Sequence, residues 1–199
     1  MGKVRFGLKN AKYALWDSST SKYKELKAIK GSVSLSLDAE GDSSDFYADD
    51  VVYATFATNS GYSGTFEIAA AEDEMLKDLL GYLDDGGMLL ETTDAKQAEF
   101  ALVFEVSGNE VEQRICLYNC SLSRAGLNAN TKQSSTDPDT QSFSFKAIGR
   151  DLEFKGETKN VVKATIENTA TNAAKFKLFM TSVPMPTDGE SLPRESHEV

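Results

Sequence analysis

Residues 31–66 read GSVSLSLDAEGDSSDFYADDVVYATFATNSGYSGTF and contain the consecutive strands around which the rest of the chain is arranged. At positions 33–37 apolar residues alternate with serines, which is typical of a strand with one buried and one solvent-facing side. Residues 51–57 are rich in β-branched and aromatic side chains and predict a second strand. The turn residues at 59–61 lead into a third strand around residues 65–69. The stretch therefore predicts antiparallel strands that follow one another in the sequence.

The segment between the first two of these strands carries acidic residues and no basic one. Gly41 and the two serines that follow Asp42 favour turns, so residues 38–50 are predicted to form a long loop. A calcium-binding loop needs Gly at its sixth position and Glu at its twelfth, where Ser43 and Asp49 stand, so the calcium pattern is not met. The acidic residues are Asp38, Glu40, Asp42, Asp45, Asp49 and Asp50.

The composition suits one domain with its own core. The chain has 199 residues, 40% of them hydrophobic, and a net charge of −10, which argues against binding to a bare phosphate backbone. The charge is uneven, because residues 1–30 carry eight Lys or Arg and only two acidic residues. No apolar run is long enough to span a bilayer or to form a signal-peptide core, so we expect a protein that is made in a cytoplasm and has no membrane partner.

Residues that usually carry catalysis or bind metals are scarce. The sole histidine is His197, close to the C-terminus, so histidine-dependent nucleophilic catalysis and His-rich metal sites are not expected. Cys116 and Cys120 would lie about 13 Å apart along a strand, too far for a disulfide, which favours buried free thiols. No pair of carboxylates stands out as a glycosidase pair. We therefore expect no enzyme activity, no cofactor and no metal.

The remaining elements are also mostly strands. Residues 72–84 predict a helix, because acidic residues at its start suit the helix dipole and Met and Leu side chains form one apolar stripe; Gly86–Gly87 is predicted to end it. Residues 100–106 and 111–120 predict a central hairpin. Further strands are expected within residues 3–16, 23–29, 141–147, 161–166 and 176–183, with connections at 149–159 and 168–174.

Two segments lack a strand or helix pattern. Residues 125–139 have no periodicity, and three of the four prolines lie after Val183. We expect residues 1–183 to form a single β domain and residues 184–199 to form a flexible tail. About nine or ten strands and one helix predict a mainly β fold of two packed antiparallel sheets, a sandwich or incomplete barrel with the helix on one side.

Six segments, in this order and spacing, carry a family resemblance: VRFGLKNAKYAL, IKGSVSLSL, SDFYADDVVYATFATNSGYSGTFEIA, DLLGY, LLETTDAKQAEFALVFEV and RICLYNCSLSR. Together they resemble the major tail tube protein of long non-contractile-tailed bacteriophages and their prophage relatives, over roughly residues 2–183. The resemblance implies two β-sheets packed as a sandwich or incomplete barrel with a flanking helix. It also implies six-membered rings that stack into a hollow tube through which viral DNA passes.

The resemblance further implies a place in the virion tail, after synthesis in the cytoplasm of a host bacterium. The implied partners are further copies of the chain, a tape measure protein, and tail-tip and tail terminator proteins. The loop of residues 38–50 is similar in position to the loop that reaches the neighbouring ring in this family, and its acidic residues are expected to meet a basic arm. The residues of this arm are Lys3, Arg5, Lys9 and Lys12.

An acidic lumen would let DNA slide without binding, because carboxylates repel the phosphate backbone. The expected lumen-facing residues are Glu105, Glu110 and Glu112. Residues 125–139 and the tail are further candidates for contacts between subunits. A second interpretation is a monomeric β-sandwich module that binds a ligand such as a carbohydrate, with Trp16, Tyr23 or Tyr62 as a stacking platform.

Overall fold

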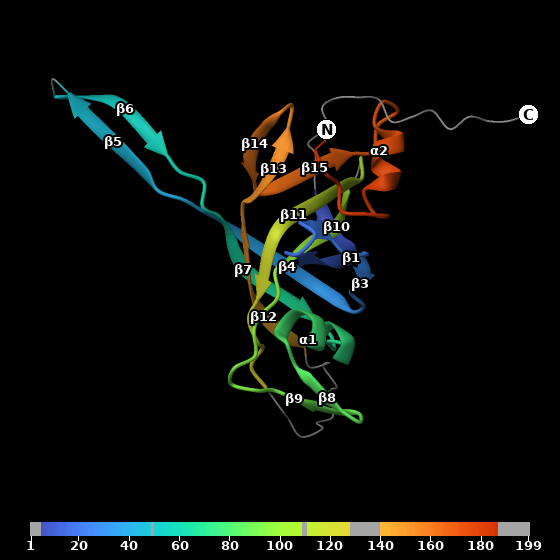
Figure 1. Ribbon diagram of the computed structural model, residues 1–199. Helices are drawn as coiled ribbons and strands as arrows, with labels where there is room; N and C mark the ends of the chain where they lie inside the picture. Colours follow the sequence, from blue (N-terminus) through green and yellow to red (C-terminus); the bar gives the residue numbers. More distant parts are fainter. Residues whose placement is uncertain (1–4, 49, 109–110, 128–139, 187–199) are drawn as a thin grey trace, which may run out of the picture.

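The computed structural model describes residues 5–48, 50–108, 111–127 and 140–186, and its dominant feature is one large antiparallel sheet (Figure 1). The strands pair in the order β2-β1-β10-β11-β12-β7-β4, with β3 paired to β1 and β15 paired to β11 as side branches. The nine strands of this sheet are β1 (Arg5–Asp17), β2 (Lys22–Tyr23), β3 (Lys27–Ala28), β4 (Ser32–Glu40), β7 (Gly61–Ile68), β10 (Phe100–Gly108), β11 (Gln113–Leu122), β12 (Gln141–Ile148) and β15 (Lys163–Glu167).

Three hairpins and two helices complete the described fold. Each hairpin is a two-stranded sheet of its own. The hairpins are β5 (Ser43–Ala48) with β6 (Val51–Ala57), β8 (Leu83–Asp85) with β9 (Met88–Leu90), and β13 (Arg150–Phe154) with β14 (Glu157–Val161). The helices are α1 (Asp73–Leu80) and α2 (Ala173–Leu178). The prediction of a mainly β fold with a flanking helix near residue 75 is confirmed, and α2 is an addition to it.

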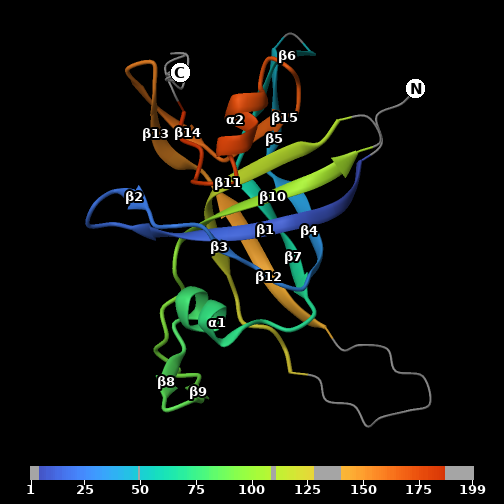
Figure 2. The same ribbon diagram turned by 90° about the vertical axis from the view of Figure 1, so that its right-hand side faces the viewer.

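The large sheet folds over so that two of its parts pack together as the layers of a sandwich. Strand β11 joins the layers, because its residues 113–117 pair with β15 while residues 119–122 pair with β12. In Figure 2 the β1–β10–β11 part crosses the β4–β7–β12 part. One core draws side chains from both parts and from α1, among them Tyr13, Phe66, Met75, Phe100, Leu117 and Phe143.

The strand pattern of the sequence is visible directly in β12. Phe143, Phe145 and Ala147 are buried, and the residues between them are exposed. Neighbouring strands β7 and β11 hydrogen-bond to β12, so its backbone groups are paired while only one of its faces is buried. The predicted strand at 141–147 is confirmed, as is the central hairpin, which is formed by β10 and β11.

The ends and number of the helices differ from the prediction. Helix α1 ends at Leu80 and is capped by Gly81, which has a left-handed backbone (φ 72°), whereas Gly86 and Gly87 lie in the turn between β8 and β9. The predicted strand at 176–183 was wrong, because its first residues belong to α2. Phe176 and Phe179, three residues apart, are both buried, so the apolar side chains serve a short helix instead of a strand. The predicted connection at 149–159 instead contains β13 and most of β14.

The predicted loop at 38–50 was also wrong. Strand β4 continues through Asp38 to Glu40, and residues 43–48 form β5. Acidic residues and serines have a low preference for strands, but β5 pairs along its length with β6, whose β-branched and aromatic residues favour strands. The cross-strand pairing therefore overrides the local preference of β5.

Several predicted features fall on residues that the structure does not describe. Lys3, Asp49, Glu110 and residues 128–139 and 187–199 lie outside the described residues, and of Arg5 only the backbone is described. Residues 184–186 of the predicted tail are described, and the carbonyl of Pro184 accepts a hydrogen bond from the Tyr118 hydroxyl at 2.7 Å.

Gly64 is a point of close approach between β7 and β4. A Cβ at this position would lie 1.9 Å from the carbonyl oxygen of Ser36, which is backbone and has no room to withdraw. We expect Gly64→Ala to lower the free energy of unfolding by about 1–3 kcal/mol, as overpacking does elsewhere. The control is Gly86→Ala, where a Cβ meets nothing within 4 Å and only the positive φ is unfavourable. Urea unfolding measures both, and equal losses would contradict the close approach at Gly64.

Candidate functional site

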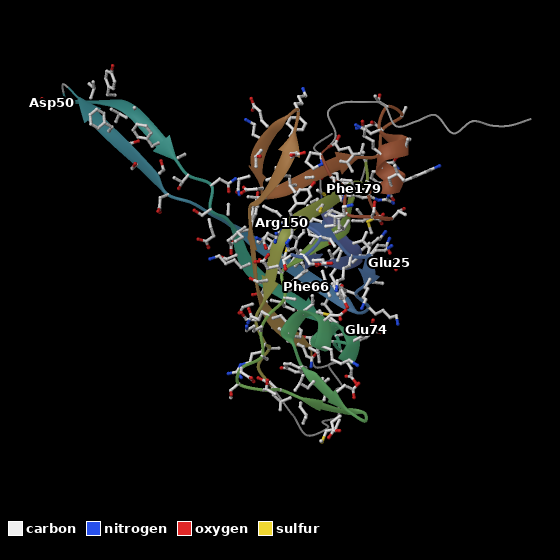
Figure 3. All side chains as sticks on the ribbon, viewed as in Figure 1. Glu25, Asp50, Phe66, Glu74, Arg150 and Phe179 are labelled. Atoms are coloured by element: carbon white, nitrogen blue, oxygen red, sulfur yellow. The ribbon has the colours of Figure 1, made fainter. Side chains whose placement is uncertain are left out.

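The β5–β6 hairpin projects from the body as a two-stranded ribbon (Figure 1). Strands β4 and β7 pair with each other as far as Glu40 and Gly61, and the chain continues beyond them into β5 and β6. At the base, the Ser60 N–H donates to the Glu40 carbonyl oxygen, with 2.9 Å between N and O. Figure 3 places Asp50 at the far end of the hairpin and Phe66 in the body. The hairpin is therefore a projection of the large sheet.

The strand register gives this hairpin one apolar and one polar face. Phe46 pairs with Ala54, and side chains of directly paired residues lie on the same face. Phe56, two residues after Ala54, lies on this face as well. The next pair, Asp45 with Thr55, lies on the opposite face, where the Thr55 hydroxyl donates to the Asp45 carboxylate at 2.7 Å.

The apolar side chains of the hairpin are largely uncovered. The rings of Phe46 and Tyr53 contact each other edge to face, with their centroids 6.3 Å apart. An isolated two-stranded hairpin is only marginally stable in water, and an exposed apolar patch marks an interaction surface. The hairpin therefore has the properties of a docking element. Its exposed hydrophobic residues are Phe46 (55% exposed), Val51 (60%), Val52 (49%), Tyr53 (75%) and Phe56 (62%).

The acidic residues predicted to form a contact loop are distributed along β4 and the hairpin. Asp38, Asp42 and Asp50 are exposed and form no ion pair within the described residues. Glu40 accepts a hydrogen bond from the Ser63 hydroxyl, and Asp45 accepts the one from Thr55. The structure thus leaves this negative charge available to a partner.

The predicted basic arm is only partly available. Lys9 is exposed, and its ammonium group has no hydrogen-bond or ion-pair partner among the described residues. The ammonium group of Lys12 instead donates to the carbonyl oxygen of Met180 at 2.9 Å. Further along the N-terminal segment, Lys27 pairs with Glu74 and Asp78 and Lys30 pairs with Glu72, all three of them in or next to α1. The charges of Lys27 and Lys30 are therefore balanced within the chain.

The predicted lumen residues have different surroundings. Glu105 is mostly buried and forms an ion pair with Arg114, with 2.6 Å between the charged atoms, and it also accepts a hydrogen bond from Asn10. Glu112 is exposed, and its carboxylate lies 3.5 Å from the side-chain amide of Asn168. Of these two residues, only Glu112 presents a carboxylate that could repel a passing anion.

The three aromatic residues considered as ligand platforms contact other side chains of the chain. Trp16 and Tyr23 meet with 4.8 Å between ring centroids, and the guanidinium of Arg150 lies 4.1 Å from the centroid of Trp16. The Tyr23 hydroxyl donates to the Tyr118 carbonyl oxygen at 2.6 Å. Over the ring of Tyr62 lies the ammonium group of Lys163, 4.7 Å from the ring centroid. Each ring is therefore already in contact with a side chain of its own chain.

Neither helix is long and apolar enough to cross a bilayer, among the residues that the structure describes. The same residues contain no group of three or more His, Cys, Asp or Glu side chains that could hold a metal ion. Comparison of the sequence with protein-family models and with curated protein sequences gives no match.

The apolar residues of the hairpin were not predicted as a candidate site from the sequence. Residues 38–50 were predicted as an acidic loop, and residues 51–57 only as a strand. A signal was present, because aromatic residues stand on both sides of the acidic pair at positions 49–50, as expected for a hairpin with aromatic side chains near its tip.

Proposed function

We propose that this chain is a structural subunit that assembles with copies of itself, of the kind that forms the tail tube of long non-contractile-tailed bacteriophages. The observation that carries the proposal is the β5–β6 hairpin, whose Phe46, Tyr53 and Phe56 side chains are more than half exposed. Such a hairpin is costly in an isolated monomer and useful in an assembly, where a neighbour covers the apolar face.

The family resemblance gives the assembly its form. In this proposal, rings of six copies stack into a tube in the virion tail, and the hairpin contacts a neighbouring subunit. A ring closes when each copy presents two different patches that fit head to tail. The net charge of −10 suits a tube that DNA passes through without binding, because the repulsion between carboxylates and phosphates prevents adhesion.

The proposed role requires no catalysis and no cofactor. The partners are further copies of the chain and, by the resemblance, a tape measure protein, a tail-tip complex and a tail terminator. In such a system assembly begins at the tail tip, so a dilute solution of the isolated protein can contain monomers. Concentration is therefore the variable that a test of self-assembly has to cover.

Light scattering over a range of protein concentrations, followed by negative-stain electron microscopy at the highest, tests the proposal. The expected result is a molar mass that rises with concentration, together with rings or tubes in the images. A protein that remains strictly monomeric at the highest concentration, with no rings, would count against self-assembly.

Reversal of the hairpin charge is expected to block assembly without unfolding the chain. In the variant Asp42→Lys/Asp45→Lys both substituted side chains are exposed, so the free energy of unfolding should change by less than about 1 kcal/mol. The altered charge of the hairpin should reduce or abolish rings and tubes. The control, Asp85→Lys/Asp94→Lys, changes the net charge equally at exposed positions outside the hairpin. Normal tubes from the Asp42/Asp45 variant would refute a role for this charge in assembly.

A further inference from the structure

Helix α2 lies on the opposite side of the body from the β5–β6 hairpin (Figures 1 and 2), and a second apolar surface lies beside this helix. It is a groove of about 750 Å³ between α2, β15, the β13–β14 hairpin and the chain that follows α2. Three of its large apolar side chains are well exposed, namely Phe154 (38%), Leu178 (46%) and Met185 (48%). We call this surface the α2 groove.

The walls of the α2 groove are held in place by contacts within the chain. The guanidinium of Arg114 donates to the carbonyl oxygen of Phe176 and lies 3.9 Å from the centroid of its ring, which fixes α2 against β11. The Tyr118 hydroxyl holds the chain after α2 through its hydrogen bond to Pro184. Phe179 and Val183 are buried beneath the groove. A preformed groove of this kind loses little conformational entropy when it binds a partner.

The α2 groove and the hairpin are complementary in charge. Among the residues that the structure describes, the charged side chains that line the groove are Lys159 and Lys175, and Lys159 forms an ion pair with Glu157 at 2.5 Å. The ammonium group of Lys175 has no hydrogen-bond or ion-pair partner within the described part of the chain. On the hairpin, the exposed charges are those of Asp42, Asp45 and Asp50. Apolar side chains flanked by opposite charges favour one orientation of docking.

We propose that the α2 groove receives the β5–β6 hairpin of a second copy of this chain, which rests on the self-assembly proposed above. The hairpin of one chain points away from its own helix α2 (Figure 1), so the contact joins two chains head to tail and leaves a free hairpin at one end and a free groove at the other. The groove thereby replaces the basic arm at residues 3–12 as the acceptor of the hairpin.

The available area predicts a weak contact. Full burial of three aromatic side chains covers about 450–750 Å², and those of the hairpin are already partly covered. The aromatic surface area that is still exposed is less than the roughly 800 Å² that each partner contributes to a stable interface. Association through this contact alone is therefore expected to depend on concentration, and a closed ring would gain strength from repetition of the contact.

Two defective variants, measured alone and mixed, test the assignment. The hairpin variant is Phe46→Ser/Phe56→Ser and the groove variant is Leu178→Ser/Met185→Ser; all four side chains are substantially exposed, so both variants are expected to fold. Each alone should associate at least roughly tenfold more weakly than the unchanged chain, because each lacks one half of the contact. Mixed, they should form a heterodimer in which an intact hairpin meets an intact groove.

Matched controls separate this contact from a general loss of apolar surface. Leu83→Ser/Met88→Ser removes one Leu and one Met, both 55% exposed, from the β8–β9 hairpin, and Thr55→Ser alters the polar face of the β5–β6 hairpin. Both control variants should associate like the unchanged chain. A groove variant that associates like the unchanged chain would overturn the groove as acceptor while leaving self-assembly in place. An unchanged chain that never associates would overturn both proposals.

If association is weak, a disulfide cross-link between two chains can still locate the contact. Phe56→Cys in one chain and Leu178→Cys in a second should form a disulfide-linked dimer on oxidation, since the native Cys116 and Cys120 are buried and do not compete. A mixture of the Phe56→Cys and Leu83→Cys chains should form much less disulfide-linked dimer than the first mixture. Equal yields in the two mixtures would overturn the proposal. It would also be overturned if the cross-link formed only after removal of residues 187–199, because that result would assign the groove to the chain's own C-terminal segment.

Discussion

A chain in which Asn-Gly replaces residues 41–60 is expected to fold as a monomer and to lose self-association at every concentration. Glu40 and Gly61 are directly paired at the base of the hairpin, so a two-residue turn can join them. Asn-Gly is the preferred sequence for such a turn, since both of its residues readily adopt the required positive φ. The large sheet retains all its strands, because β5 and β6 form a sheet of their own.

The stability of this shortened chain should be close to that of the full chain. The removed hairpin has no buried large hydrophobic residue among its described side chains, so its loss should change the free energy of unfolding by about 1 kcal/mol or less. Thermal unfolding followed by circular dichroism measures stability, and light scattering measures association. The control replaces residues 84–89 by Asn-Gly, which joins the paired Leu83 and Leu90 in the same way and should leave association intact. Rings or tubes formed by the chain without β5 and β6 would exclude the hairpin as the assembly element.

The sheet was predictable where a strand has one buried and one exposed face. In β12 the alternation of Phe143, Phe145 and Ala147 with polar residues is a direct consequence of strand geometry, and it is readable without the structure. Helix α2 was not predictable in this way. It has six residues, too few to show a helical period, and it is held by tertiary contacts such as the one between Phe176 and Arg114.

The position of the candidate site was predicted from the sequence, but its apolar face was not. The position of the acidic segment drew attention to residues 38–50, yet the apolar face depends on which residues of β5 and β6 stand opposite each other. The register shifts between Phe46 and Tyr47, so that Tyr53 is an extra residue in β6. A register shift of this kind changes which side chains share a face, and it cannot be predicted from the alternation of residues in the sequence alone.

The sequence also could not predict which basic residues near the N-terminus remain unpaired in the fold. Eight basic residues in the first thirty suggested an acceptor for the acidic hairpin. In the fold, Lys27 and Lys30 lie beside α1 and pair with its acidic residues, which are more than forty residues away in the sequence. Which charges remain available to a partner is therefore a property of the tertiary structure.

Alkaline pH is expected to unfold the protein through the titration of thiols and phenols that are buried in the folded chain. Cys116 and Cys120 are fully buried, and burial raises the pKa of both thiols well above the ordinary value of 9.0. Below pH 9 the thiols are protonated in both states and do not affect the pH dependence of stability. Above pH 9 they lose protons only in the unfolded chain, so stability falls as pH rises toward the pKa of the folded state.

The slope of this loss is large. Each thiol contributes about 1.4 kcal/mol per pH unit, so the pair removes about 3 kcal/mol per unit above pH 9. Burial also raises the pKa of Tyr13, Tyr23 and Tyr118 from the ordinary value of 10.0, and these side chains add to the loss above pH 10. Since an ordinary domain has about 5–15 kcal/mol of stability, unfolding is expected near pH 11.

Urea unfolding at intervals between pH 8 and 10.5 measures this slope directly. The Cys120→Ala variant provides the comparison, because it removes one titrating thiol and should reduce the slope between pH 9 and 10 by about half, whatever its own stability at pH 8. A free energy of unfolding that stays constant from pH 8 to 10.5 would show that the thiols titrate equally in both states, contrary to their burial in the folded chain.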